Sequence, residues 1–219
     1  MNFLFQQLPL AVQLRDDCTF DNFFPADNAL LLNQLQQQLA GGERYIYLFG
    51  NEGSGRSHLL QAACHAASKN NYASVFLPLG ELRDYPPQDL FDGLEQLSLV
   101  CLDDIHEVIG MSDWEEQLFH LFNRLSDKNV ALLVSSDRSV RELKPRLDDL
   151  NSRLSWGSIY QLQANDDEQR LAVFQFRAGK RGIVLEDEVA RFIYHRCQRD
   201  MNALLAVLDK LDLASITEQ

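Results

Sequence analysis

A glycine-rich segment that could bind phosphate directly follows an apolar run. The apolar run is Tyr45-Ile46-Tyr47-Leu48-Phe49, and the segment reads Gly50-Asn51-Glu52-Gly53-Ser54-Gly55-Arg56-Ser57. Glycines let the backbone curl so that successive N–H groups point at phosphate oxygens. A helix predicted from Ser57 to about Ser68 would add the positive end of its dipole. The whole segment is therefore predicted to bind the phosphates of a nucleotide.

Three side chains at the end of this segment determine what chemistry it could perform. Arg56 stands where a phosphate-binding loop usually has lysine, so the charge remains but a planar fork replaces a compact ammonium. Ser57 stands where a hydroxyl would bind Mg²⁺. His58 could contact phosphate or simply begin the helix. We expect phosphate binding to be retained and hydrolysis by this chain alone to be weak.

A pair of acidic residues follows a second apolar run. The run ends at Leu102, and Asp103 and Asp104 come next. In phosphoryl-transfer proteins, acidic residues at a strand end hold Mg²⁺, and a positioned polar group orients the attacking water. Asp103 is therefore predicted to hold Mg²⁺ together with Ser57, and Asp104 to orient the water. The alternative is a solvated strand end at which Asp104 merely starts a turn.

The apolar runs that carry these motifs alternate with helical patterns. Continuous apolar strands separated by helices indicate a parallel sheet covered on both faces. After about residue 165 the pattern is helical only. Asn165–Glu168 has the form of a capping box, and apolar stripes follow at Val189, Phe192 and Ile193 and at Leu204, Leu208 and Leu211. The predicted strands are 45–49, 73–79, 97–103, 130–136 and 158–162.

Composition indicates an ordinary globular protein of the cytoplasm. The 219 residues are 46% hydrophobic and carry a net charge of -12, which argues against a general binder of nucleic acid or of anionic membranes. No apolar run approaches the length of a membrane span, and the first residues lack the basic flank of a signal peptide. The cysteines lie far apart in sequence without a CxxC pair, so reduced, buried thiols are expected at Cys18, Cys64, Cys101 and Cys197.

The ordered set of motifs resembles the AAA+ ATPases, and within them the DnaA-related branch. Thr19–Phe23 is similar to the segment that precedes the first helix in DnaA relatives, and Val134–Arg138 to the sensor 1 strand end. Asn151–Gly157 is similar to the segment that bears the family's arginine finger. The resemblance covers nearly the whole chain. It implies an α/β AAA+ P-loop domain with a five-stranded parallel sheet flanked by helices, and a small all-helical lid domain.

The resemblance also implies roles for residues that their spacing alone does not assign. Arg153 would be the arginine finger, and Asp137 a catalytic sensor residue. Phe20 and Phe23 would contact the base. The phosphate-sensing arginine of the lid would fall near Arg199, Met201 and Asn202, with Asn202 itself at the family position. Either Arg199 takes over the phosphate contact or this lid does not sense the terminal phosphate.

Three features predict which branch member the chain resembles. The first is that the chain stops after the lid, without a helix-turn-helix domain. The second is that the segment between the second and third predicted strands, residues 80–96, is short and contains Pro86-Pro87, which disfavours an extra helix for binding single-stranded DNA. Gln7-Leu8-Pro9-Leu10 is similar to peptides that dock on the bacterial sliding clamp, through Gln7, Leu8 and Leu10. The expected domains are a clamp-binding arm at 1–15, the AAA+ domain at 16–163 and the lid at 164–219.

This resemblance implies a negative regulator of DNA replication initiation. Such a protein would hold a nucleoside diphosphate, with ADP expected, and Mg²⁺. Together with the DNA-loaded clamp it would promote hydrolysis of ATP on the initiator DnaA, through Arg153 supplied in trans. Such a regulator could form a homodimer or a higher oligomer, and strong direct DNA binding is not expected of it. The alternatives are an autonomous AAA+ ATPase that remodels a partner as helicase loaders do, a DNA-binding initiator fragment, and a small-molecule kinase.

Overall fold

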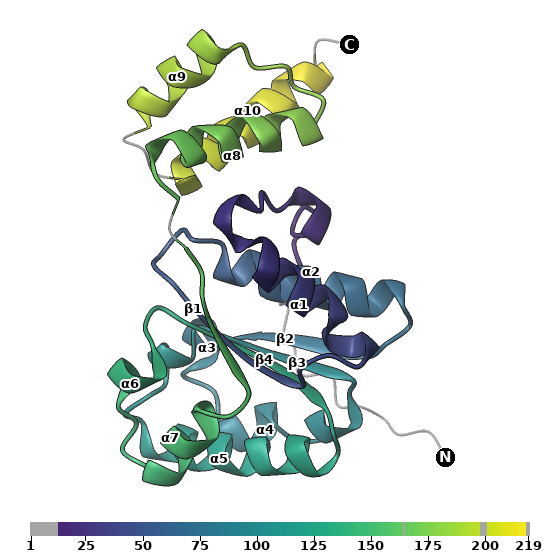
Figure 1. Ribbon diagram of the computed structural model, residues 1–219, viewed down its shortest axis with the longest axis vertical. Helices are drawn as coiled ribbons and strands as arrows, with labels where there is room; N and C mark the ends of the chain where they lie inside the picture. The colour runs from purple at the N-terminus through teal and green to yellow at the C-terminus, as the bar shows by residue number, and fades with distance from the viewer. Residues whose placement is uncertain (1–12, 164, 198–200, 218–219) are drawn as a thin grey trace.

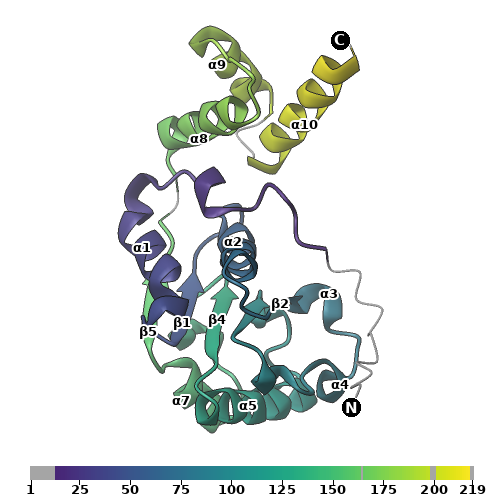
Figure 2. The same cartoon turned by 90° about the vertical axis from the view of Figure 1, so that its right-hand side faces the viewer.

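A five-stranded parallel sheet forms the centre of the larger domain. In the computed structural model, which describes residues 13–163, 165–197 and 201–217, helices cover both faces of this sheet and a separate helical unit lies beyond one end (Figures 1 and 2). The strand order is β2-β3-β4-β1-β5, with every neighbouring pair parallel. The strands are β1 (Tyr45–Phe49), β2 (Ser74–Pro78), β3 (Leu99–Asp103), β4 (Ala131–Ser136) and β5 (Ser158–Gln161). The predicted α/β fold class is confirmed.

Alternate residues of each central strand enter two separate cores, because successive side chains of a strand point to opposite faces. On β3, for example, Leu99 and Cys101 face α1 (Ala29–Gln37) and α2 (Arg56–Lys69), while Val100 and Leu102 face the other layer. That second layer consists of α3 (Leu79–Leu82), α4 (Pro87–Leu90), α5 (Ser112–Asp127), α6 (Val140–Leu143) and α7 (Asp148–Leu154). Short 3₁₀ turns lie at Phe20–Asn22, Ala26–Asn28, Gln38–Ala40, Leu94–Gln96 and Ile105–Glu107.

The thiols match their sequence-based expectation except at Cys197, which is only partly buried, and the segment between β2 and β3 matches its own. All four cysteines are free, and Cys18, Cys64 and Cys101 are buried. The Sγ atoms of Cys64 and Cys101 lie 3.6 Å apart between α2 and β3. Between β2 and β3 the helices α3 and α4 have four residues each, so neither is a long extra helix.

The helical unit has a core of its own. It comprises α8 (Asp167–Lys180), α9 (Asp187–Arg196) and α10 (Met201–Thr217), which pack around Leu171, Phe174, Tyr194, Leu204 and Leu208. The predicted stripe on α10 is right for Leu204 and Leu208, which are fully buried, while Leu211 is 36% exposed.

Two details of this unit differ from the sequence-based prediction. The capping box is one residue later than expected, since Asp166 caps the Gln169 N–H and the Gln169 side chain caps Asp166 in return. On α9 the predicted stripe is right for Ile193, which packs against the core of this unit, but wrong for Val189 and Phe192, which are 45% and 60% exposed. The buried face instead contains Ala190 and Tyr194, four residues apart on one side of the helix. Alanine allows close approach of the helices, and the Tyr194 hydroxyl hydrogen-bonds Asp167 at 3.0 Å.

A buried carboxylate fixes the position of the chain segment that leads into α7. Glu115 on α5 is 2% exposed, and its oxygens accept backbone N–H bonds from Gly110 at 2.7 Å, Arg146 at 3.2 Å and Leu147 at 2.9 Å. An anionic acceptor with three N–H donors is satisfied despite its burial. Glu115 therefore determines where the chain enters α7, the helix that carries Arg153.

We predict that Glu115→Gln lowers the free energy of unfolding by about 1–3 kcal/mol, because the amide NH₂ turns a donor toward backbone donors and leaves buried groups unpaired. Urea denaturation measures the change. Glu116→Gln is the matched control, since Glu116 is the exposed neighbour on the same helix. Equal stability of the two variants would contradict the anchoring role of Glu115.

Candidate functional site

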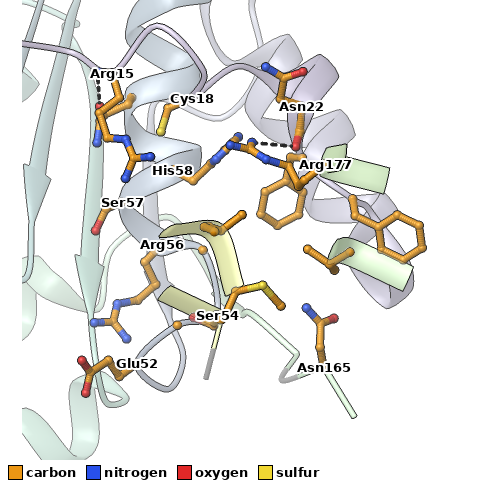
Figure 3. Close-up of a pocket in the computed structure, with 18 of the residues that line it drawn as sticks. Arg15, Cys18, Asn22, Glu52, Ser54, Arg56, Ser57, His58, Asn165 and Arg177 are labelled. Atoms are coloured by element: carbon orange, nitrogen blue, oxygen red, sulfur yellow. Dashed lines mark hydrogen bonds between the residues drawn. The ribbon is translucent and has the colours of Figure 1, made fainter. Parts of the chain in front are cut away.

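A cavity of about 340 Å³ lies where the glycine-rich loop, the leading segment (residues 13–28) and the helical unit meet (Figure 3). Figure 2 shows the leading segment running between α2 and the helical unit. The cavity therefore has one wall from each of three parts of the chain. Its lining comprises Arg15, Cys18, Asn22, Phe23, Phe24, Asn51, Glu52, Gly53, Ser54, Gly55, Arg56, Ser57, His58, Gln61, Asp104, Asn165, Val173, Arg177, Met201 and Leu205.

The loop geometry explains the glycine at position 55. Gly55 has φ +98° and is the N-cap of α2, and a Cβ there would lie 2.7 Å from the Phe23 ring. Left-handed backbone and the close aromatic ring both exclude a side chain. Gly53 also has positive φ, at +74°. The loop thus opens onto the cavity with the start of α2 behind it, as a phosphate site requires.

Arg56 is engaged by the protein itself. It is 8% exposed, its Nη1 donates to the Gly50 carbonyl, and its Nη2 donates to Asp104 Oδ1 at 2.7 Å. Arg56 Nε and the Ser54 hydroxyl are buried and have no hydrogen-bond partner among the described residues. Unsatisfied polar atoms beside a glycine loop fit a site completed by a polar ligand such as phosphate.

The two residues predicted to hold a metal lie together. Asp103 is 4% exposed, and it accepts hydrogen bonds from the hydroxyls of Ser57 and Ser135. Burial raises the pKa of Asp103, and these hydrogen bonds oppose the increase. Within the described residues no three His, Cys, Asp or Glu side chains form a metal cluster. A hard cation would therefore rely on Asp103, Ser57, phosphate oxygens and water, which is the kind of ligand set that Mg²⁺ accepts.

Asp104 adopts an unusual backbone conformation at the strand end. Its φ is +53° and ψ +53°, and its N–H donates to Ser135 Oγ at 2.9 Å. Left-handed backbone at a residue other than glycine is uncommon and concentrates at functional sites. The conformation directs the Asp104 carboxylate to Arg56 rather than into the strand.

His106 connects the acidic strand end to the predicted sensor residue. Its Nδ1 lies 3.9 Å from Asp104 Oδ1 and 3.6 Å from Asp137 Oδ1, and it accepts the Asp137 backbone N–H at 3.3 Å. The Asp137 carboxylate itself pairs with Arg138 at 2.6 Å, and this hydrogen bond lowers the pKa of Asp137. Sequence reasoning missed His106, because β3 and β4 bring these residues together only in the folded sheet.

A charge cluster holds the leading segment against the helical unit. The Asp17 carboxylate pairs with Arg15 at 3.2 Å, with Arg181 at 3.6 Å and with Arg177. Arg177 is 5% exposed, and its Nη1 also donates to the Asn22 carbonyl at 3.0 Å (Figure 3). Burial alone would raise the pKa of Asp17, but Arg15 and Arg177 outweigh it and lower the pKa. Sequence reasoning missed Asp17 and Arg177, which are 160 residues apart.

His58 connects the leading segment to the loop. Its Nε2 lies 2.8 Å from the Thr19 carbonyl and therefore donates to it, and its ring packs on Phe23 with centroids 5.5 Å apart. Burial lowers the pKa of His58 to about 4, so the ring is neutral at pH 7. His58 lines the cavity, while its donor nitrogen is used to hold the leading segment.

Several predicted site residues lie outside the cavity lining. Phe20 packs in the core beside α2, and Gly50 contributes its carbonyl to Arg56. Arg199, Gln7, Leu8 and Leu10 lie outside the described residues, and the side chain of Asn202 does so too. Met201 lines the cavity. In the part of the chain that the structure describes, no helix has the length and apolar character needed to cross a membrane.

Arg153 is presented on the opposite side of the sheet from the cavity. It lies in α7, in the layer that faces away from α2 (Figure 1). Its Cζ lies 4.1 Å from the centroid of the Trp156 ring and 5.8 Å from that of Phe119. An arginine at this position could instead serve in a surface ion pair, but within the described residues its guanidinium forms no ion pair and no hydrogen bond.

We predict that His58 makes the protein sensitive to mild acid. Its folded pKa is about 4 against an ordinary value of 6.5, so its stabilising contribution is complete above pH 6.5 and is lost as pH falls toward 4. His58→Gln keeps an amide donor and cannot titrate. Between pH 7 and about 4.5, wild type should lose about 2 kcal/mol more unfolding free energy than this variant.

Urea denaturation at several pH values measures this difference. His65→Gln is the control, because His65 is on the same helix and also bonds a leading-segment carbonyl, that of Arg15 at 3.0 Å, but this bond is exposed to solvent. Parallel pH profiles for wild type and His58→Gln would refute the prediction.

Comparison with known proteins agrees with this geometry. Residues 14–161 match the family described as the bacterial DnaA ATPase domain, and residues 167–219 match the lid domain of Hda. Domain III of the Thermotoga maritima replication initiation protein DnaA is similar over 95% of this chain and 93% of that one, with 22% identity and TM-score 0.78. AMPPCP-bound DnaA from Aquifex aeolicus has TM-score 0.77 at 22% identity, over 91% of this chain and 66% of that one.

A further similar structure is the replication initiator DnaA bound to AMPPCP and single-stranded DNA, with TM-score 0.75, 22% identity and 91% of this chain covered. The chain spans 66% of the length of that initiator. These likenesses establish the fold, and the family matches together cover the sheet domain and the helical unit. The chain therefore belongs to the DnaA family of AAA+ proteins, as an Hda-like member whose helical unit is the lid.

Proposed function

We propose that this chain is a nucleotide-bound negative regulator of DNA replication initiation. In this proposal it stimulates hydrolysis of ATP bound to the initiator DnaA by supplying Arg153 in trans. The observation that carries the proposal is the state of Arg153: an arginine in the family's finger segment, stacked on an indole, with no ion pair or hydrogen bond within the described residues. A guanidinium in that state keeps its charge and its N–H donors available for a phosphate.

The nucleotide in this chain has a structural role in the proposal. The glycine loop with Ser57, the leading segment and the lid surround one cavity, and Asp103 lies behind Ser57, hydrogen-bonded to its hydroxyl, so a bound ADP with Mg²⁺ would touch loop, leading segment and lid together. Its phosphates would bind the loop amides, and Mg²⁺ would neutralise phosphate charge beside Asp103 and Ser57. The bound nucleotide would thus stabilise the relative position of the sheet domain and the lid.

The engagement of Arg56 supports weak turnover by this chain itself. Both terminal nitrogens of Arg56 donate to protein atoms, one to the Gly50 carbonyl and one to Asp104. The same ion pair occupies the carboxylate predicted to orient water. Phosphoryl transfer depends on positioned charge at the terminal phosphate. A site whose cation and acid neutralise each other is better suited to holding a nucleotide than to hydrolysing it.

The amino-terminal arm supplies the second half of the proposal. Gln7, Leu8 and Leu10 match a clamp-docking peptide and precede the leading segment. Docking through a short extended peptide would tether this chain to clamps on DNA and raise its effective concentration near DNA-bound initiator. Such a tether explains how a weak protein–protein contact could act only where replication has begun.

We predict that Arg153→Ala lowers the stimulated rate of hydrolysis by at least 100-fold. An arginine finger supplied in trans contributes ~10³–10⁵ in rate, whereas a surface ion pair contributes ~0–1 kcal/mol to stability. The assay is single-turnover hydrolysis of ATP preloaded on DnaA, with DNA-loaded clamp. Arg191→Ala is the matched control, because Arg191 is an exposed arginine in an i,i+4 ion pair with Asp187. Near-wild-type stimulation by Arg153→Ala would exclude the finger role.

We predict that the double substitution of Gln7 and Leu10 by alanine abolishes association with the sliding clamp. The glutamine anchor and the apolar plug would both be lost, while the folded domains are untouched. Surface plasmon resonance on immobilised clamp measures the binding. Calorimetry with ADP should give the wild-type affinity, which shows that the fold is intact. Unchanged clamp affinity would remove the tether from the proposal.

A further inference from the structure

Trp156 is a large side chain without a place in either core of the sheet domain. It is 47% exposed and belongs to neither buried cluster of that domain. Exposing an indole leaves apolar surface in water, so the ring is not explained by packing. The guanidinium of Arg153 lies over its ring, with Cζ 4.1 Å from the centroid.

The backbone around Trp156 holds the indole in this position. The Trp156 N–H donates to the Arg153 carbonyl at 3.0 Å, which places the two side chains on one turn at the end of α7. Gly157 follows with φ +67°, and a Cβ there would lie 2.3 Å from the Tyr45 carbonyl. The chain can therefore pass from α7 to β5 against β1 only with glycine at this point. The turn and the glycine together fix where the indole lies.

Stacking and ion pairing have opposite consequences for an arginine. A carboxylate partner would neutralise the guanidinium and occupy its N–H donors. An aromatic face attracts the cation while leaving the in-plane N–H edge unoccupied. Phe119 on α5, at 5.8 Å from Cζ, adds a second ring beside the guanidinium. Arg153 is thus oriented and still chemically available.

We propose that Trp156 is the positioning residue of the finger: its indole holds Arg153 in one orientation with the N–H edge directed away from this chain, toward a phosphate on a second protein. This inference rests on the proposed function. An arginine side chain has many rotamers, and part of this freedom is lost when the side chain is fixed on a phosphate. Holding it beforehand lowers that loss in the transition state, so Trp156 acts on the maximal rate rather than on binding.

The test varies the chemistry of the ring at position 156. Trp156→Phe keeps an aromatic face, Trp156→Leu keeps apolar bulk without one, and Trp156→Ala removes both. The assay is single-turnover hydrolysis of ATP preloaded on DnaA with DNA-loaded clamp, over a range of concentrations of each variant. It yields a maximal rate and a half-saturating concentration. Tyr72→Ala is the control, because Tyr72 is another half-exposed aromatic residue.

We expect Trp156→Ala and Trp156→Leu to lower the maximal rate by roughly threefold to tenfold, as loss of a cation–π contact implies. Trp156→Phe should retain most of the rate, and the half-saturating concentration should change by less than about twofold in all three, because binding is unaffected. In an Arg153→Ala background, Trp156→Ala should have no further effect, since Trp156 acts through Arg153.

Three outcomes would overturn the inference. The first is a wild-type maximal rate for Trp156→Ala. The second is an equal loss caused by Trp156→Ala in the Arg153→Ala background. The third is a raised half-saturating concentration with the maximal rate retained, which would make Trp156 a contact for the partner instead. Full stimulation by Arg153→Ala would overturn the proposed function itself. That outcome is measured on the Arg153 variant, so it is distinguishable from failure of the inference, which is measured on the Trp156 variants. Urea denaturation and ADP calorimetry on each variant verify that the domain is folded.

Discussion

The charge cluster around Asp17 is the interaction on which the cavity depends. One carboxylate in the leading segment pairs with Arg15 beside it and with Arg177 and Arg181 of the lid. Among the described residues, no other ion pair joins α8 to the leading segment. A buried ion pair adds little net stability, because desolvation offsets the attraction, but it penalises every arrangement that leaves a charge unpaired. Asp17 therefore specifies geometry, and the cavity with its three walls follows from it.

The parts that were predictable from sequence are those governed by neighbours in the chain. Continuous apolar runs predicted the strands, because strands of a parallel sheet are buried on both faces, and the glycines of the loop predicted a candidate phosphate site, because their backbone freedom is a local property. Asp17–Arg177 and His106 were missed, because they join segments that only the folded sheet and lid bring together. On α9 the apolar pattern was wrong at two of its three positions, since the small Ala190 and the hydrogen-bonded Tyr194 face the core instead of the bulkier Val189 and Phe192.

Arg56 shows how one substitution can change a site without dismantling it. A lysine ammonium is a compact charge on a flexible stem, while the arginine fork offers several donors in a fixed plane. Here that plane spans the Gly50 carbonyl and Asp104, so the residue connects the start of its own loop to the end of β3. The left-handed backbone of Asp104 makes this contact possible. The ion pair occupies both the cation and the carboxylate of the candidate site, which agrees with the proposal that a nucleotide would be bound here without being hydrolysed.

The cavity and Arg153 lie on opposite faces of the sheet. The cavity lies on the α2 side of the sheet, and α7 packs in the opposite layer, over Glu115 and the rest of α5. Two anchors converge on α7, the helix that carries Arg153: the buried Glu115 carboxylate fixes its beginning, and Gly157 against the Tyr45 carbonyl fixes the chain after its end. Since Tyr45 begins β1, and β1 leads into the phosphate loop, the strand that presents the loop also supports the turn that carries Trp156 and Arg153. The cavity at one end of β1 and Arg153 near the other thus share a single strand, so in the proposed function a nucleotide bound in the cavity would be connected to the proposed finger through β1.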